Sequence, residues 1–179
     1  MSVASDHALN GDVRIAYDVQ GDGAPVLLIH GLGYGRWGWQ PLTDDLARRY
    51  RVITLDNRGY GSSDKPAGPY TAEQMAEDAV AVLEAAGVDR AHVVGTSLGG
   101  AVAQELALRH PARVEKLVLL STMSGVTNMH PLPEKTLRMM AEAPSLDPAV
   151  ALRRFVENAL DPEPEPELVE RIVALRTLY

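Results

Sequence analysis

A serine stands at the centre of residues 95–100, which read G-T-S-L-G-G and contain the pattern G-x-S-x-G. The apolar run of residues 91–94 precedes this pattern and predicts a strand, followed by a sharp turn and the start of a helix. In that setting the pattern is typical of a nucleophile elbow, which lifts a serine hydroxyl out of the backbone at the carboxyl edge of a parallel sheet. Ser97 is therefore the candidate nucleophile of an acyl-transfer reaction.

A serine hydroxyl reacts well only with a base that takes its proton, an acid that orients the base, and donors that receive the oxyanion. The backbone N–H of Leu98 directly follows the serine at a predicted helix start, so we expect it to be one donor. We expect the second donor to be the N–H of Leu32, in the loop after the apolar run of residues 25–29. Tyr34 and Trp37 follow that loop. They either line an acyl or alcohol pocket or pack a helix on the sheet.

The elements that must position these groups follow from the hydrophobic pattern. Apolar runs alternate with helical patterns, which predicts an α/β fold with a mostly parallel sheet and crossover helices. Thr71 and Gln74 form a capping box at the start of a helix that ends at Gly87. The predicted strands cover residues 13–19, 25–31, 51–56, 91–94 and 114–120.

The pattern changes after Ser121, where three helical stretches follow and no further strand is predicted. Residues 161–167 alternate proline with acidic residues and predict an extended connector before a last helix. We therefore expect a sheet core at residues 1–122 and a helical lid at residues 123–179.

Composition excludes several classes of function. The chain has 179 residues, 17 Lys plus Arg against 24 Asp plus Glu, a net charge of −7 and no cysteine. Nucleic acids and anionic membranes attract clustered positive charge, so we expect neither as a partner. The absence of cysteine excludes disulfides and thiolate metal sites. With no signal-like or membrane-spanning run, a cytoplasmic protein without metal or cofactor is expected.

Four segments together carry a resemblance to a known family. They are residues 30–33 (H-G-L-G), 56–63 (D-N-R-G-Y-G-S-S), 95–100 and 109–114 (R-H-P-A-R-V). In this order they resemble the α/β-hydrolase superfamily, in its lid-bearing esterase, lactonase and C–C hydrolase branch, over nearly the whole chain. The resemblance implies Ser97 as nucleophile, an oxyanion hole at Leu32 and Leu98, and a small ester or lactone as substrate.

The same resemblance implies that part of the active site lies outside the 179 residues. In this family the acid and then the histidine follow the serine, on loops after two further strands beyond the lid. We expect these two strands to be absent here, and the acid and histidine to come from a complementary carboxy-terminal fragment or a second copy of the chain. Alone, the chain is expected to be nearly inactive, with residues 114–120 as an uncovered sheet edge.

A histidine within the chain could substitute for the base, and the sequence contains five. His30 belongs to the oxyanion loop, and His92, His110 and His7 are expected far from the serine hydroxyl. His130, between the last predicted strand and the lid, is the one candidate at the right end of the sheet.

Other classes of protein were considered. A catalytically inactive binding module or a homodimer of this chain remains an alternative, because base and acid are absent. Glycines in residues 31–35 followed by Asp56 weakly resemble a dinucleotide fingerprint, but Arg36 stands where the helix-packing glycine belongs. Asp56 and Arg58 are interpreted as structural loop residues. A serine rather than an aspartate at the elbow excludes epoxide hydrolases and haloalkane dehalogenases, whereas cofactor-free perhydrolases and C–C hydrolases stay possible.

Overall fold

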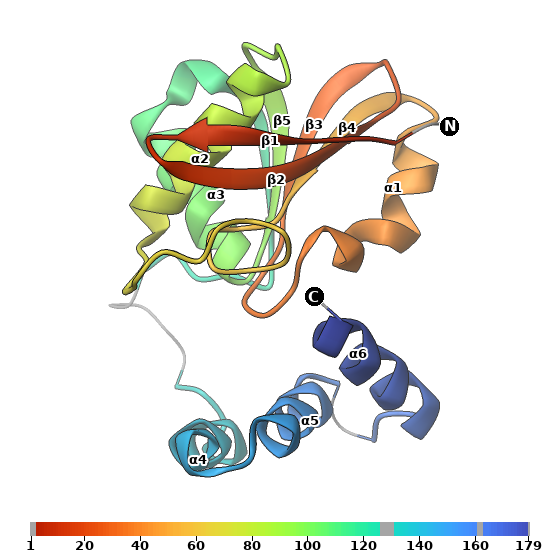
Figure 1. Ribbon diagram of the computed structural model, residues 1–179, viewed down its shortest axis with the longest axis vertical. Helices are drawn as coiled ribbons and strands as arrows, with labels where there is room; N and C mark the ends of the chain where they lie inside the picture. The colour runs from red at the N-terminus through yellow and green to blue at the C-terminus, as the bar shows by residue number, and fades with distance from the viewer. Residues whose placement is uncertain (1–2, 126–130, 161–162, 179) are drawn as a thin grey trace. The chain divides into compact units, whose positions relative to one another are not determined.

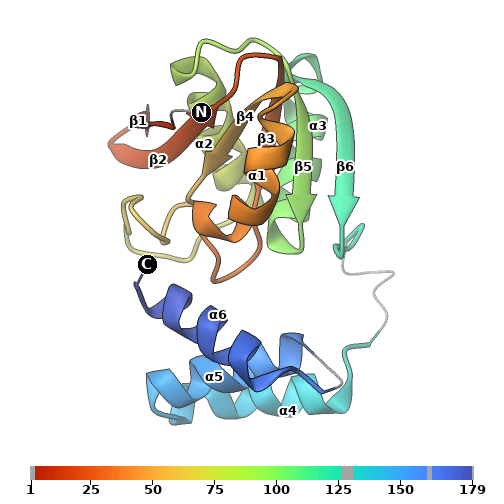
Figure 2. The ribbon, with the colours of Figure 1, turned by 90° about the vertical axis from the view of Figure 1, so that its right-hand side faces the viewer.

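The computed structural model describes residues 3–125, 131–160 and 163–178, which divide into two compact units, residues 1–127 and 128–179. The first unit is built on a six-stranded sheet with the order β1-β2-β4-β3-β5-β6. Strands β3 to β6 are parallel, and β1 and β2 are antiparallel to their neighbours (Figures 1 and 2). The α/β architecture expected from the sequence is confirmed. The strands are β1 (Ala4–Asn10), β2 (Val13–Gln20), β3 (Ala24–Ile29), β4 (Tyr50–Leu55), β5 (Ala91–Thr96) and β6 (Val114–Leu120).

Helices cover both faces of this sheet, as the alternating pattern requires. Helices α2 and α3 lie on one face, and α1 lies on the other (Figure 2). The larger apolar core lies under α2 and α3, whereas a smaller one around Trp39 lies under α1. The helices of this unit are α1 (Gln40–Leu46), α2 (Ala72–Ala85) and α3 (Leu98–Arg109), with short 3-10 turns η1 (Arg36–Trp39) and η2 (Pro111–Arg113).

Helix α2 begins as its sequence predicts. The Thr71 hydroxyl accepts from the Gln74 N–H at 3.2 Å, and the Gln74 side chain accepts from the Thr71 N–H at 3.1 Å. Its inward positions are fully buried, with Ala79 and Val82 both 0% exposed. Such a reciprocal cap fixes the first turn, and removing it costs about 1 kcal/mol.

Strand β1 was not predicted. Only Ala8 of its seven residues is buried, so the apolar alternation that marks a strand is missing from its sequence. The strand forms because its backbone pairs with β2 along its whole length, from Ala4 opposite Val19 to Asn10 opposite Val13.

Strand β6 lies at the other edge of the sheet and is exposed on both faces (Figure 2). Leu117, Val118, Leu119 and Leu120 are 37%, 46%, 41% and 43% exposed. A continuous apolar run is typical of a strand buried on both faces, so this sequence suits the middle of a sheet better than its edge.

The second unit consists of helices. They are α4 (Glu134–Glu142), α5 (Pro148–Ala159) and α6 (Pro166–Leu178), with the 3-10 turn η3 (Ala143–Ser145). Asp147 caps α5 by accepting from the N–H of Ala149 at 2.9 Å, as predicted. The connector is shorter than expected, because α6 already begins at Pro166, where proline suits the first helical turn.

Candidate active site

Ser97 occupies the apex of a strand–turn–helix in the first unit, between β5 and α3. Its backbone has φ +53° and ψ −119°, a combination that L-residues adopt only under strain. The Ser97 N–H donates to the Leu120 carbonyl at 2.9 Å, and the Thr122 hydroxyl donates to the Ser97 carbonyl at 2.8 Å. The chain on both sides of the turn is thus held while the serine side chain stays exposed.

The turn is possible only because glycines surround it. A Cβ on Gly95 would lie 2.3 Å from the Gly99 carbonyl oxygen, and one on Gly99 would lie 2.2 Å from the Ile29 carbonyl oxygen. Both clashes are with backbone, which cannot rotate aside. The end of β3 and the elbow are therefore in direct backbone contact.

The predicted oxyanion loop lies beside the serine. A Cβ on Gly31 would be 3.0 Å from the Ser97 Cβ and 3.6 Å from its Oγ, so Gly31 touches the serine side chain. A turn follows in which the Tyr34 N–H donates to the Gly31 carbonyl at 3.3 Å, with Gly33 at φ +72°. Leu32 lies within this turn, and its side chain is 49% exposed. Leu98 begins α3, where backbone N–H groups have no intrahelical acceptor.

The aromatic residues after this loop form a stack. The His30 and Tyr34 rings are parallel to within 16°, with centroids 4.5 Å apart, and Trp37 contacts Tyr34 at 5.1 Å. The Trp39 ring is tilted by 53° against the His30 ring, with the centroids 4.9 Å apart. Tyr34 and Trp37 are both half-buried, so each ring supports the loop and exposes part of its surface.

Within the described part of the chain, no side chain is placed as a base for Ser97. Among the residues that the structure describes, none makes a hydrogen bond to the Ser97 Oγ. His110 pairs with Glu77 at 2.9 Å, His92 packs edge-on against Tyr50, and His7 is on β1 at the far edge of the sheet. His130 lies outside the described residues.

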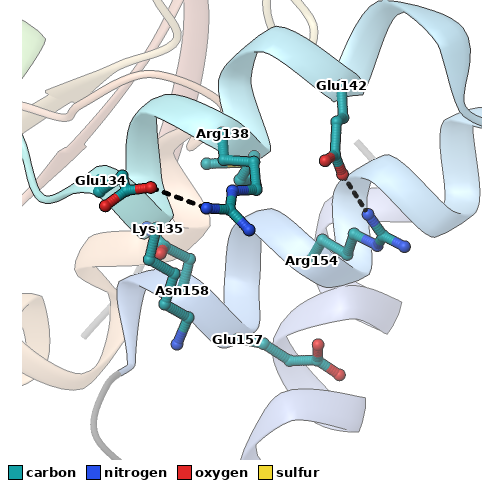
Figure 3. Close-up of a pocket in the computed structure, with 8 residues that line it drawn as sticks. Glu134, Lys135, Arg138, Glu142, Arg154, Glu157 and Asn158 are labelled. Carbon is teal, nitrogen blue, oxygen red and sulfur yellow. Dashed lines mark hydrogen bonds and ion pairs between the residues drawn. The ribbon is translucent and has the colours of Figure 1, made fainter.

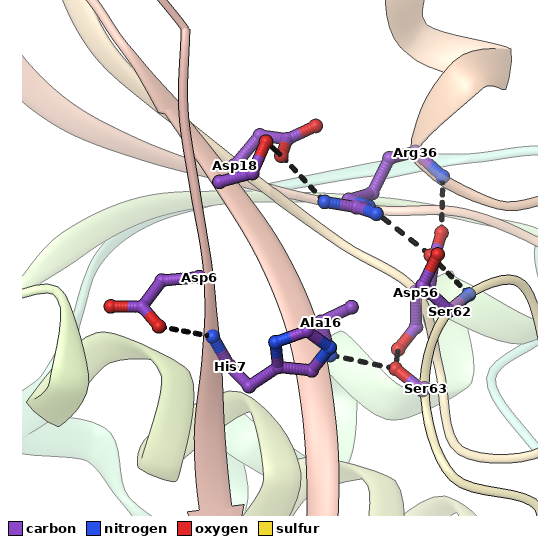
Figure 4. A network of polar contacts seen from close by, with 9 residues as sticks. Asp6, His7, Ala16, Asp18, Arg36, Asp56, Ser62 and Ser63 are labelled. Atoms are coloured by element: carbon purple, nitrogen blue, oxygen red, sulfur yellow. Dashed lines mark hydrogen bonds and ion pairs between the residues drawn. The ribbon is translucent and has the colours of Figure 1, made fainter.

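The loop after β4 is a structural support, as its sequence suggests (Figure 4). The buried Asp56 carboxylate accepts from the Arg36 backbone N–H at 2.7 Å, the Arg36 Nε at 3.1 Å and the Ser62 N–H at 2.9 Å. Arg36 also pairs with Asp18 at 2.5 Å. The carboxylate therefore closes the loop and ties it to η1 and β2.

A second buried pair holds the same loop to α2. Arg58 donates two hydrogen bonds of 2.6 Å to Asp78, and Asn10 donates a third to that carboxylate at 2.8 Å. The hydrogen bonds that Arg58 donates to Asp78 raise the pKa of the guanidinium above its usual value, so the guanidinium stays charged. Arg58 is thus engaged within the fold rather than presented to a ligand.

The second unit contains a separate groove of about 440 Å³ between α4 and α5 (Figure 3). Arg138 pairs with Glu134 along α4 at 2.7 Å, and Arg154 on α5 pairs with Glu142 on α4 at 2.9 Å. Its three cations and three anions balance, which gives it no preference for either charge.

Within residues 3–125, 131–160 and 163–178, no helix has the length and apolar character needed to cross a bilayer. Over the same residues, no three side chains of His, Asp or Glu gather as metal ligands would.

Comparisons with known proteins agree with this geometry. A sequence description of the alpha/beta hydrolase fold matches residues 24–160, and the chain belongs to this family. The RutD protein of Azorhizobium caulinodans, named as a carbamate hydrolase, is 42% identical over 115 residues, which are 64% of this chain and 43% of that protein. The 2-hydroxymuconate semialdehyde hydrolase of Pseudomonas sp. strain CF600 is 42% identical over 119 residues, 64% of this chain and 42% of that protein.

A solved structure extends the likeness to the fold. Est816, described as an N-acyl homoserine lactone degrading enzyme, has 35% identity and a TM-score of 0.76, and the match covers 94% of this chain and 64% of that one. The chain spans less than half the length of the curated relatives it matches. Its class is thus that of the α/β hydrolases.

Proposed function

We propose that this chain is the nucleophile-bearing part of a serine hydrolase that acts on a small ester or lactone. The observation that carries the proposal is the strained, exposed Ser97 held against Gly31 between β5 and α3. Strain of this kind persists where the surrounding structure enforces it, and it clusters at reactive sites.

The proposed reaction begins when a base removes the Ser97 proton and the Oγ attacks the substrate carbonyl carbon. The carbonyl π electrons move onto oxygen, and the N–H groups of Leu32 and Leu98 stabilise this oxyanion. Collapse breaks the bond to the alcohol oxygen, which leaves with the proton from the base. Water activated by the same base then releases the acid and restores the serine. A lactone gives one ring-opened product.

Base and acid are proposed to come from a complementary carboxy-terminal segment or a second chain. Three observations support this: no described residue bonds the Ser97 Oγ, β6 exposes four apolar residues, and the match covers only 64% of the Est816 chain. Removing the base of a serine triad costs about a millionfold in turnover, so the 179 residues alone should be nearly inert.

Substrate class is proposed from the aromatic pair and the relatives. Tyr34 and Trp37 present partly exposed rings beside the oxyanion loop, which suits an apolar acyl or alcohol group. The Est816 description, a lactone-degrading enzyme, favours a lactone or ester. Two relatives are named for hydrolysis of a carbamate and of 2-hydroxymuconate semialdehyde, so these two compounds should be assayed beside the esters and lactones.

The test measures nitrophenyl-ester and N-acyl lactone turnover by the chain with and without a carboxy-terminal complement, together with fluorophosphonate labelling. Labelling and turnover that need the complement, and that Ser97→Ala abolishes, support the proposal. Turnover by the complemented chain that survives Ser97→Ala refutes it.

A binding module without catalysis is a second candidate, favoured by the lack of a described hydrogen-bond partner for the Ser97 Oγ. It predicts no labelling of Ser97 in any preparation, together with saturable binding of an ester or lactone measured by calorimetry.

A further inference from the structure

Asn57 has a buried side-chain amide whose nitrogen donates a hydrogen bond, whereas its oxygen accepts none from the described residues. The residue is 2% exposed and follows β4, beside the carboxyl end of β3. Its Nδ2 donates to the His30 carbonyl oxygen at 3.0 Å. Its Oδ1 is fully buried, and no described residue donates to it. An unsatisfied buried acceptor costs about 1–3 kcal/mol, which offsets much of what the bond to the His30 carbonyl contributes to stability.

The bond from Asn57 holds a carbonyl that is wedged against the elbow. A Cβ on Gly99 would lie 2.7 Å from this His30 oxygen, so the oxygen sits in the crease between β3 and the start of α3. The next residue, Gly31, touches the side chain of Ser97. The His30–Gly31 peptide therefore lies between the Asn57 amide and the elbow.

Further hydrogen bonds link the position of the His30–Gly31 peptide to the rest of the loop. The Gly31 N–H donates to the His30 Nδ1 at 2.7 Å, and the stack with Tyr34 and Trp39 fixes that ring. The Gly31 carbonyl accepts from Tyr34 and closes the turn that contains Leu32. Rotation of the His30–Gly31 peptide would disturb both bonds and turn the Leu32 peptide with them.

Asn57 itself is firmly placed. The Ser63 hydroxyl donates to the Asp56 carbonyl at 2.6 Å and accepts from the Ala16 N–H at 2.8 Å, while the Tyr60 N–H donates to the Asn57 carbonyl at 3.0 Å. A buried donor on a fixed loop is suited to hold a second loop in one orientation, because its own rotamer is locked by its surroundings.

We propose that Asn57 is a positioning residue of the oxyanion hole. By holding the His30 carbonyl, it keeps the Gly31–Leu32 backbone in the orientation that presents the Leu32 N–H to the developing oxyanion at Ser97. The effect on catalysis rests on the proposed function, whereas the hold of Asn57 on the loop through the His30 carbonyl does not depend on it.

The test compares Asn57→Leu with Gln20→Leu, both in the chain combined with its carboxy-terminal complement. Gln20 is also a buried amide, 8% exposed, but its side chain donates to Asp44 on α1 instead of the His30 carbonyl. Loss of one oxyanion donor lowers kcat about 10²–10³-fold, so a displaced donor in Asn57→Leu should lower kcat about 10–100-fold. KM should stay within about twofold, because the oxyanion exists only in the transition state.

The urea midpoint of Asn57→Leu should stay close to that of the parent, because removal of the orphaned Oδ1 offsets the loss of the hydrogen bond to the His30 carbonyl. Amide hydrogen exchange in residues 30–35 should be at least about tenfold faster in Asn57→Leu and unchanged in Gln20→Leu. An unchanged kcat in Asn57→Leu, or a loss of kcat and stability equal to that of Gln20→Leu, overturns the inference.

Failure of the proposed function gives a different pattern. If the complemented parent shows no turnover that depends on Ser97, the serine-hydrolase proposal is refuted, and hydrogen exchange alone then decides the role of Asn57. Faster exchange confined to residues 30–35 supports positioning of the loop, and unchanged exchange overturns it.

Discussion

Replacement of Ser97 by glycine should make the first unit more stable than replacement by alanine. Alanine keeps the Cβ that makes φ +53°, ψ −119° unfavourable, and it removes only an exposed hydroxyl. Glycine populates positive φ without this penalty. The pair of variants therefore separates the backbone strain of the elbow from the loss of the hydroxyl.

The expected difference follows from two opposing terms. A residue held in a sparsely populated backbone region costs about 1–3 kcal/mol, and glycine relieves this. Glycine also loses about 0.5–1 kcal/mol more backbone entropy on folding. The free energy of unfolding of Ser97→Gly should thus exceed that of Ser97→Ala by about 0.5–2 kcal/mol. This corresponds to a few °C in Tm for a chain of this size.

Urea unfolding followed by tryptophan fluorescence measures this difference. Both tryptophans, Trp37 and Trp39, belong to the first unit, so the signal reports that unit alone. Equal m-values would show that the variants differ in stability rather than in the size of the unfolding transition. A Ser97→Gly variant equal to or less stable than Ser97→Ala would refute the argument that the elbow stores strain.

Three further predictions concern the rest of the first unit. Asp78→Asn should destabilise this unit by about 3–5 kcal/mol in urea unfolding, because Arg58 then stays charged and buried without an anionic partner. The double variant Arg58→Met, Asp78→Leu removes both charges and should destabilise the unit much less. The Arg14 guanidinium lowers the pKa of Asp64 below 3.8, so this pair stabilises above that pH and the effect is lost as pH falls through the folded-state pKa. Asp64→Asn should therefore lower the urea midpoint at pH 7 and converge with the parent in acid; a constant gap would contradict this. Leu119→Lys should reduce concentration-dependent light scattering while changing stability by less than about 1 kcal/mol; unchanged scattering would show that β6 does not drive association.

Features set by neighbouring residues could be predicted from the sequence. The strand, turn and helix around Ser97, the capping box at Thr71 and the aspartate cap of α5 each depend on a few adjacent side chains, and all were found where expected. The α/β class could be predicted as well, because buried parallel strands consist of continuous runs of apolar residues.

Features that depend on strand order could not be predicted in the same way. Strand β1 forms by pairing with β2, and its own sequence has one buried position, Ala8. The bond from Asn57 to His30 requires β3 and β4 to be parallel neighbours with their carboxyl ends together. In the candidate site, Ser97 can be predicted from its motif. Asn57 lies in the segment of residues 56–63 that resembles the family, but nothing in that segment indicates a bond to the His30 carbonyl.

The two edges of the sheet place different limits on assembly. Strand β1 ends the sheet with polar side chains such as Ser5, Asp6 and His7, whereas β6 ends it with four apolar ones. Two copies joined through β6 would present β1 at both outer edges, so growth would stop at a pair instead of continuing into a filament. A complement that covers β6 would terminate growth even earlier, at a single chain.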